Sequence, residues 1–308
     1  MKMNNDSEIF ILFINGIGDA ILTIPLINYL FERFGKKMII IAPNDINSYV
    51  YSNINCLKYS ISFNRDCDNP FIKYQSDIKN LFLEYPKKAH QILISLNAYY
   101  PYWQFEDEIR NFYNFDFVYD FEKYNCKNNK VPMLFQYLNI LGLKIDIERY
   151  RFINIKFDDL NEAKKNCSKI STKYDNIVTI HCDTTFEKEW PKDYWNDFMF
   201  SLHQELNCFI FLLGVIRPIN NYSFIKTIKP DWHKQIAYLK ESDYFFGIDS
   251  CWAHVADTFN KRGIVLFSKN SDSKVWGPMS KNLHQIVKND LKEFSSLDLI
   301  NYFKKLFK

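Results

Sequence analysis

The sequence lacks the features that mark several common classes of protein. Its seven cysteines include no C-x-x-C pair and none at zinc-ligand spacing from a histidine, so we predict no metal site. No apolar run approaches the roughly 18 residues that a membrane-spanning helix needs. The formal net charge of +3 is too small to indicate nucleic acid as a partner. The first residues, MKMNNDSEIF, are too polar for a signal peptide, so we expect a cytoplasmic protein with reduced thiols.

What the sequence does contain is a long alternation of short apolar runs with stretches of helical spacing. This alternation is typical of parallel, doubly wound sheets, so we predict an α/β fold. Strands are expected at 10–13, 37–42, 57–63, 91–96, 115–119, 176–180, 208–213, 244–247, 263–267 and 283–287. Helices are expected after residue 18 and at 71–85, 131–141, 158–170, 191–206, 231–241 and 250–260, with a turn at 43–45.

A domain boundary is predicted in the stretch 144–157, which is polar and has no strong period. The chain of 308 residues is long enough for two domains of moderate size. We therefore expect domains at 1–157 and 158–308. The second domain should begin with a helix that has two aspartates, Asp158 and Asp159, in its first turn. Two doubly wound halves in tandem imply a ligand held in a cleft between them.

The stretch 10–30, FILFINGIGDAILTIPLINYL, carries the first candidate site. A buried run leads through Gly16 and Gly18 into a helix. The glycines let the backbone approach a ligand, and the helix start offers free N–H groups. Asp19 is expected at the edge where open α/β sheets bind ligands. The alternative is that Asp19 merely caps the helix.

Three segments in the second half follow the same logic, since each follows a strand and leads toward a helix. The first, HCDTTFEKEWP, places the hydroxyls of Thr184 and Thr185 near Lys188, a combination suited to phosphate; its Pro191 is expected as the first helical residue. The second, GIDSC at 247–251, opens the helix that carries His254 and offers backbone N–H groups.

The third segment, 268–278, ends in Trp-Gly-Pro. Because the carboxyl ends of parallel strands lie on one edge of a sheet, all three segments are expected to converge there. We expect Trp190 and Trp276 to be packing residues, and His254 to be a structural hydrogen-bonding group rather than an acid or base.

Four separated segments resemble signatures of the heptosyltransferase family, the ADP-heptose:lipopolysaccharide type of glycosyltransferase family 9. GIGDAILTIPLINYL resembles the family's G-D-x-x-x-x-x-P opening, and HCDTTFEKEWPKDYW resembles its H-x-(S/T)-x-K-x-W-P segment. ESDYFFGIDSCWAHVAD is similar to its A-D-x-x-(I/V)-G-x-D-(S/T)-G-x-x-H-x-A-A segment, and IVLFSKNSDSKVWGP to its L-F-G-x-T-x-x-x-x-W-G-P loop. The resemblance implies the GT-B fold, in which two Rossmann-like domains face a central cleft.

The resemblance also implies roles for individual residues. The first domain would be the acceptor side, with Asn15, Gly16 and Gly18 lining it and Asp19 as the general base for the acceptor hydroxyl. The second domain would bind the nucleotide sugar, and its donor-binding residues would be Thr184, Thr185, Lys188, Asp249, Ser250, Cys251 and His254. Among them, Lys188 would neutralise the diphosphate and Asp249 would contact the sugar. The backbone amides of Ser250 and Cys251 would bind the phosphates.

The reaction implied is a single displacement with inversion, which needs no metal where a lysine and a helix start stabilise the leaving diphosphate. No cofactor is expected beyond the nucleotide-sugar co-substrate, ADP-heptose by family precedent. The acceptor would be a glycan or glycolipid of the bacterial surface, such as lipopolysaccharide core or capsule.

Departures from the family pattern leave alternatives open. Cys251 and Trp252 stand where the family has glycine and its neighbour, Asp257 replaces a small residue, and no acid follows Gly214. Another nucleotide sugar is therefore an alternative donor. An epimerase of nucleotide sugars and a non-catalytic nucleotide-sugar-binding protein are the alternative functions.

Two segments bear on the acceptor. The aromatic stretch 97–114 could stack on sugars or could simply pack on its own domain. The stretch 295–308, SSLDLINYFKKLFK, predicts a basic amphipathic helix. Such a helix either docks on an anionic membrane, here the inner face of the inner membrane, or packs on its own protein.

Overall fold

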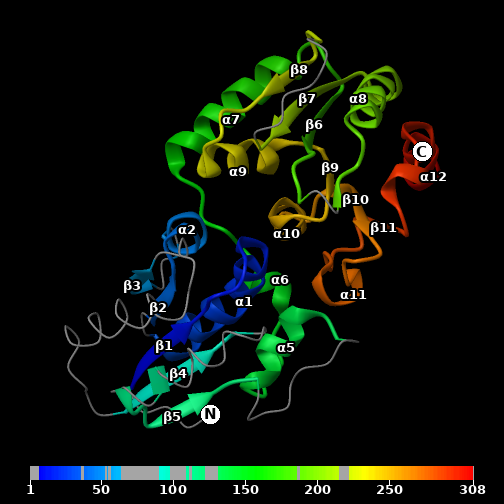
Figure 1. Cartoon of the computed structure of the whole chain (residues 1–308). Helices are drawn as coiled ribbons and strands as arrows, with labels where there is room; N and C mark the ends of the chain where they lie inside the picture. Colours follow the sequence, from blue (N-terminus) through cyan, green and yellow to red (C-terminus); the bar gives the residue numbers. More distant parts are fainter. Residues whose placement is uncertain are drawn as a thin grey trace. The chain divides into compact units, whose positions relative to one another are not determined.

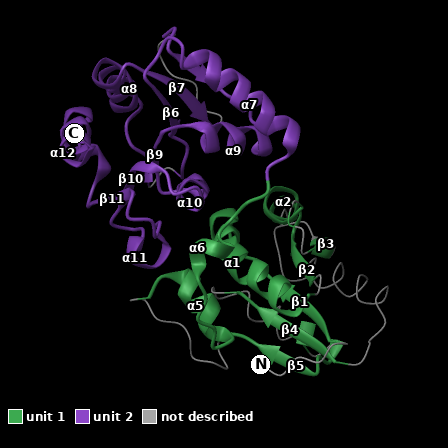
Figure 2. Cartoon of the chain, turned by 180° about the vertical axis from the view of Figure 1, so that it is seen from behind, with its two compact units in different colours: residues 1–154 green, residues 155–308 purple. Residues whose placement is uncertain are grey.

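The computed structural model describes residues 7–35, 38–52, 54, 57–63, 90–97, 109–110, 113–121, 131–185, 188–214 and 222–307. The chain divides into two compact units, residues 1–154 and 155–308 (Figure 2). This division falls within the polar stretch 144–157. Both units contain a parallel sheet with helices, which confirms the predicted α/β class.

The sheet of unit 1 has the strand order β3-β2-β1-β4-β5, and every described pairing in it is parallel (Figure 1). Its strands are β1 (Glu8–Leu12), β2 (Met38–Pro43), β3 (Leu57–Phe63), β4 (Gln91–Ser95) and β5 (Phe117–Tyr119). Strand β1 lies in the centre and is buried from Ile9 onward, as its apolar run predicts. The central position places the end of β1 at the reversal of strand order, where such sheets bind ligands.

The described helices of unit 1 are α1 (Ile17–Phe34), α2 (Asn44–Ile46), the π-helical turn η1 (Asn47–Tyr51), α5 (Met133–Ile140) and α6 (Ile147–Tyr150). The prediction of a turn at 43–45 was wrong, because helix α2 begins directly after β2. Pro43, with φ of −55°, is its N-cap. Asn47 secures this junction by donating to the carbonyl of Ala42 at 2.9 Å. The expected helix at 71–85 and most of the aromatic stretch 97–114 lie outside the described residues.

The sheet of unit 2 has six parallel strands in the order β11-β10-β9-β6-β7-β8. They are β6 (Asn176–His181), β7 (Cys208–Leu213), β8 (Ile225–Thr227), β9 (Tyr244–Ile248), β10 (Arg262–Ser268) and β11 (Leu283–Lys288). Sequence analysis missed β8. This three-residue edge strand is half-exposed or exposed throughout, so it has no apolar run.

The helices of unit 2 are α7 (Phe157–Ile170), α8 (Lys192–Leu206), α9 (Trp232–Glu241), α10 (Cys251–Thr258), α11 (Ser273–Trp276), the 3-10 turn η3 (Leu291–Glu293) and α12 (Ser296–Phe307). Helix α8 begins one residue later than expected, so Pro191 is its N-cap and not its first helical residue. Trp190 is buried, and its indole N–H donates to the carbonyl of Phe294 at 2.6 Å, which confirms a packing role.

The amphipathic helix α12 packs on its own unit. Its residues Leu299 and Phe303 are buried in the hydrophobic core of unit 2, where the Phe303 ring contacts the rings of Tyr244 and Phe246. An ion pair of 2.6 Å between Lys304 and Glu205 joins α12 to α8. The apolar face is therefore used inside the protein. No helix in the described ranges is long and apolar enough to cross a membrane.

Candidate functional site

The first candidate site lies in unit 1, where the chain leaves β1 and enters α1. Asn15 is buried, and its amide donates to the carbonyl of Leu96 at 3.4 Å, which links the ends of β1 and β4. Gly16 is exposed and is the N-cap of α1, with φ of −73° and ψ of 168°. Any residue can adopt this extended backbone. Gly18 lies within the first turn of α1, so neither glycine forms the left-handed turn that an unusual loop would need.

Asp19 is the third residue of α1 and is half-exposed. Its Oδ2 accepts the backbone N–H of Gly16 at 3.2 Å, which completes a capping arrangement at the helix start. The capping alternative is therefore realised in the structure. It does not exclude a role as a base, because the carboxylate is half-exposed at the helix start, where a proton can reach it.

Beneath this turn, the hydroxyls of Thr23 and Tyr51 lie 2.8 Å apart. Tyr51 is fully buried, and burial raises the pKa of its phenol, with the negative charge of Asp19 adding to the effect. The phenol therefore stays protonated and supports the first turns of α1. Sequence analysis missed Tyr51, since nothing in the residue spacing pairs position 51 with position 23.

The second candidate site, in unit 2, is organised around Asp249, directly after β9. Its Oδ2 accepts hydrogen bonds from the ammonium of Lys188 and from the hydroxyl of Ser271, each at 2.6 Å. Its backbone carbonyl accepts from the hydroxyl of Thr184 at 3.2 Å. One residue thus ties together the loops that follow β6, β9 and β10, as their expected convergence requires.

Lys188 makes an ion pair with Asp249, and the two side chains are 33% and 13% exposed. The lysine is thus the more accessible partner and can be drawn toward an arriving anion. Thr185 is exposed, and its carbonyl accepts the backbone N–H of Lys188 at 2.9 Å. Ser271 was not among the predicted site residues. Its signal was its place in the third of the converging segments.

Ser250 is the N-cap of α10, and its hydroxyl lies 3.1 Å from Nδ1 of His181. Burial lowers the pKa of His181 to about 3, so the ring is neutral at physiological pH. Nε2 lies 4.0 Å from the carboxylate of Asp183, which favours the proton on Nε2 and leaves Nδ1 to accept from Ser250. Asp183 itself lies against Gly214, where a Cβ would come within 2.0 Å of its Oδ2.

At Cys251 and Trp252 the sequence departs from the family pattern, and here the Trp252 side chain packs against other rings. The Trp252 ring lies 4.8 Å from the ring of Trp232 and 5.9 Å from that of His181, measured between centroids. Burial raises the pKa of the Cys251 thiol to about 12, so it stays neutral. The start of α10 therefore carries one tryptophan that is anchored in an aromatic cluster.

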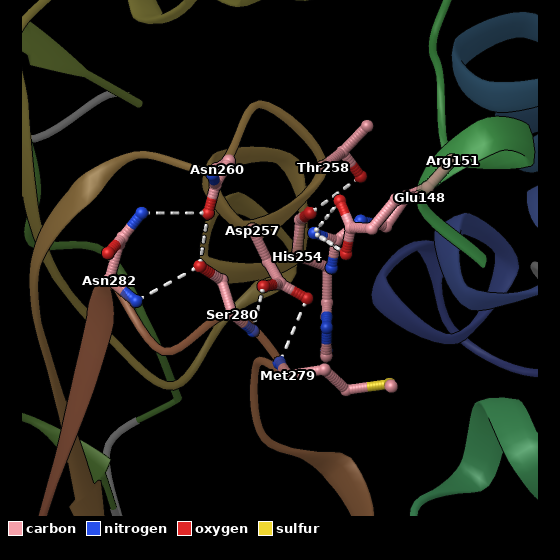
Figure 3. Close-up of polar contacts among 9 residues, drawn as sticks. All are labelled: Glu148, Arg151, His254, Asp257, Thr258, Asn260, Met279, Ser280 and Asn282. Carbon is pink, nitrogen blue, oxygen red and sulfur yellow. Dashed lines mark hydrogen bonds and ion pairs between the residues drawn. The ribbon is translucent and has the colours of Figure 1, made fainter. Parts of the chain in front are cut away.

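The departure at Asp257 also has a structural explanation. Its carboxylate is buried and accepts the backbone N–H groups of Met279 and Ser280 at 3.0 and 2.7 Å (Figure 3). Ser280 in turn donates to Asn260 at 2.5 Å. Asp257 thereby fixes the segment between α11 and β11 to helix α10. A small residue at this position would leave those N–H groups without the carboxylate.

His254, one turn into α10, is buried, and burial lowers its pKa. Its Nδ1 makes no hydrogen bond within the described part of the chain. The expected hydrogen-bonding role of its ring is thus not fulfilled by Nδ1. Among the described residues, no group of three or more histidine, cysteine or acidic side chains could hold a metal ion.

No family model and no curated protein sequence matches the chain. Solved structures do match it over nearly its full length. A family 9 glycosyltransferase from Veillonella parvula is 15% identical with a TM-score of 0.77, covering 99% of this chain and 98% of its own. ADP-heptose lipopolysaccharide heptosyltransferase II from E. coli is 12% identical with a TM-score of 0.71, covering 97% and 98%.

A third match is the E. coli heptosyltransferase WaaC with ADP, which is 13% identical with a TM-score of 0.69 and covers 97% of this chain and 99% of its own. Likeness at this identity concerns the fold. Together with the two parallel sheets, it shows that this chain has the α/β fold, GT-B, of the family 9 glycosyltransferases and heptosyltransferases.

Proposed function

We propose that this protein is an inverting glycosyltransferase that moves a sugar from a nucleoside diphosphate to a glycan of the bacterial surface. The observation that carries the proposal is the group around Asp249, where an accessible lysine and two hydroxyls meet beside the start of α10. A lysine and helix-start amides together suit a diphosphate. They also supply the positive charge that a leaving diphosphate requires.

In this proposal the second unit holds the donor. Lys188, Thr184 and Thr185 bind the diphosphate, as do Ser250 and Cys251 through their amides, and Asp249 contacts the sugar. His254 contributes its unpartnered Nδ1 to the donor side. We take ADP-heptose as the first donor to test, because heptosyltransferases share the fold and the structure of WaaC contains ADP.

The first unit supplies the base. Asp19 accepts the proton of the acceptor hydroxyl while that oxygen forms a bond to the anomeric carbon of the sugar. The bond from the anomeric carbon to the diphosphate oxygen breaks, and the diphosphate leaves with the electron pair. Single displacement inverts the anomeric configuration. Asn15, Gly16 and Gly18 would border the acceptor.

We propose lipopolysaccharide core or capsule as the acceptor and the cytoplasm, at the inner face of the inner membrane, as the location. Contact with that membrane would have to come from a surface other than the apolar face of α12, because that face packs inside unit 2. Vesicle co-sedimentation with anionic lipids tests this contact directly.

The proposal is tested by calorimetry and thermal shift with ADP, GDP, UDP and CMP and their sugar conjugates. Selective stabilisation by one diphosphate, with turnover of its sugar conjugate, is the expected result. If none of the nucleotides stabilised the protein, the proposal would be contradicted, and the protein would be a non-catalytic member of the fold. Interconversion of the free sugar nucleotide, without transfer, would identify an epimerase instead.

A further inference from the structure

A pocket of about 330 Å³ lies in unit 2 at the carboxyl ends of β10 and β11. Its walls come from the loop after β10, the turn η3 after β11, and Glu189 in the loop after β6. None of its lining residues is among those that contact Asp249. Its residues therefore differ from those of the group to which we assign the diphosphate, although the two sets adjoin.

Ser268 forms the buried part of this pocket. It is the last residue of β10, and by strand alternation it shares a sheet face with the core residues Leu266 and Ile264. That apolar face thus ends in a hydroxyl at the point where the pocket begins. Ser268 is only 4% exposed, and its Oγ has no hydrogen-bond partner within the described ranges. A buried hydroxyl without a partner carries a cost that a bound polar group would remove.

The other lining groups present a mixture of donors and acceptors. The donors are the ammonium groups of Lys269 and Lys292, and the amides of Asn270 and Asn289 both donate and accept. The carboxylate of Glu189 accepts, as does that of Asp290, whose Oδ1 already holds the N–H of Lys292 at 2.9 Å.

This composition selects one class of ligand. The two carboxylates are balanced by the two ammonium groups, so the lining has no net charge that would select an anion or a cation, and the polar walls do not suit an apolar ligand. Hydroxyl groups both donate and accept, so they match the whole set. Leu291, buried at the base of η3, adds an apolar surface of the kind that a sugar ring can contact through its C–H groups.

We infer that this pocket is a sugar-binding subsite that receives the hydroxyls of a pyranose. Two connections place it beside the Asp249 group: Glu189 directly follows Lys188 in the chain, and the carbonyl of Ser268 accepts the backbone N–H of Ser271 at 3.0 Å. The assignment of the sugar to a glycosyl transfer rests on the proposed function. The sugar is either that of the donor or one of the acceptor glycan.

Saturation-transfer NMR with free D-glucose, D-mannose and L-glycero-D-manno-heptose tests the subsite. We expect saturation transfer to at least one sugar with the full-length protein. Ser268→Ala and, independently, Asn289→Ala should weaken it by about fivefold, the effect of one hydrogen bond. Asn289 is exposed, so its variant keeps the test valid if the buried serine variant does not fold.

Lys281→Ala is the matched control for Lys292→Ala. Lys281 is equally exposed but precedes β11, at the opposite edge of the sheet. The Lys292 variant should lose sugar binding, and the Lys281 variant should keep it. Sugar signals that are absent, or that are the same in wild type and all pocket variants, would overturn the inference.

Competition separates the two sources of the sugar. Displacement by the nucleotide sugar but not by the nucleoside diphosphate identifies the donor sugar, while retention in the presence of both identifies an acceptor sugar. These experiments also separate a failure of the subsite inference from a failure of the proposed function. Loss of nucleotide binding with sugar binding intact contradicts the transferase proposal alone, and the reverse result contradicts the subsite alone.

Discussion

The ammonium of Lys188 lies 2.6 Å from Oδ2 of Asp249, although the two residues are 61 positions apart in the chain. This pair joins the loops after β6 and β9. It also means that a diphosphate must compete with a carboxylate for the lysine. The competition gives two variants with opposite expected effects on nucleotide binding.

Lys188→Ala should weaken the binding of ADP by about tenfold or more, because hydrogen bonds to charged groups contribute about 1.5–3 kcal/mol. Asp249→Asn should bind ADP at least as tightly as wild type, since it frees the lysine, but it should transfer sugar poorly. Titration calorimetry measures both, with Lys281→Ala as the control. Unchanged ADP binding in Lys188→Ala would mean that the lysine serves only to neutralise Asp249.

The two roles of Asp19 are separated by a pair of variants. Asp19→Asn keeps an oxygen that can accept the N–H of Gly16 but cannot take a proton, so it should retain stability and lose transfer by about 10²–10⁴-fold. Asp19→Ala removes both functions and should also cost about 1 kcal/mol of unfolding free energy. Urea unfolding and initial rates distinguish them. Full activity of Asp19→Asn would show that the residue is a cap and nothing more.

The stability of unit 2 should depend on pH through His181. Burial lowers its pKa from 6.5 to about 3, and unfolding restores the ordinary value. Between these values the unfolded chain binds a proton that the folded chain does not, so stability present above pH 6.5 is lost as the pH falls toward 3. The loss is at most about 1.4 kcal/mol per pH unit. Urea unfolding at pH 7 and pH 5 measures it.

His181→Asn should reduce that dependence, whatever its effect on stability at pH 7, because one buried histidine is gone while His254, whose pKa is also lowered by burial, remains. His284→Asn, at a half-exposed position in β11, is the control: it keeps His181 and should keep the part of the slope that His181 causes. Equal slopes in wild type and His181→Asn would show that other groups set the acid sensitivity.

Asp257 gives a prediction about stability alone. Asp257→Ala removes the acceptor of the Met279 and Ser280 N–H groups and should cost about 1–3 kcal/mol. Asp257→Asn keeps one acceptor oxygen and should cost less. Thermal unfolding ranks the two variants. If Asp257→Ala unfolded at the same temperature as wild type, water would have to replace the carboxylate as hydrogen-bond acceptor with no loss of stability.

The sequence predicted the sheets well because parallel strands are buried on both faces and so form short apolar runs. This signal fails for the edge strand β8, which has no apolar run. Helix α11 was missed for another reason, because its four residues are too few to show a helical period. The carboxyl-edge segments that converge on Asp249 followed from topology. Ser271, Tyr51 and the buried Ser268 did not, because each acts through a contact between distant parts of the chain that no local pattern records.

All the pairings described in both sheets join parallel strands, and this has a kinetic consequence. Parallel neighbours cannot be joined by a tight hairpin, since each needs a crossover connection. In β6 and β9, for example, His181 is paired with Gly247. No such strand pair can form early from residues close in sequence, so each unit has to close long loops before its sheet gains any hydrogen bonds. Refolding should therefore be slow for the size of each unit, and the unpaired strands should be exposed to aggregation while it proceeds.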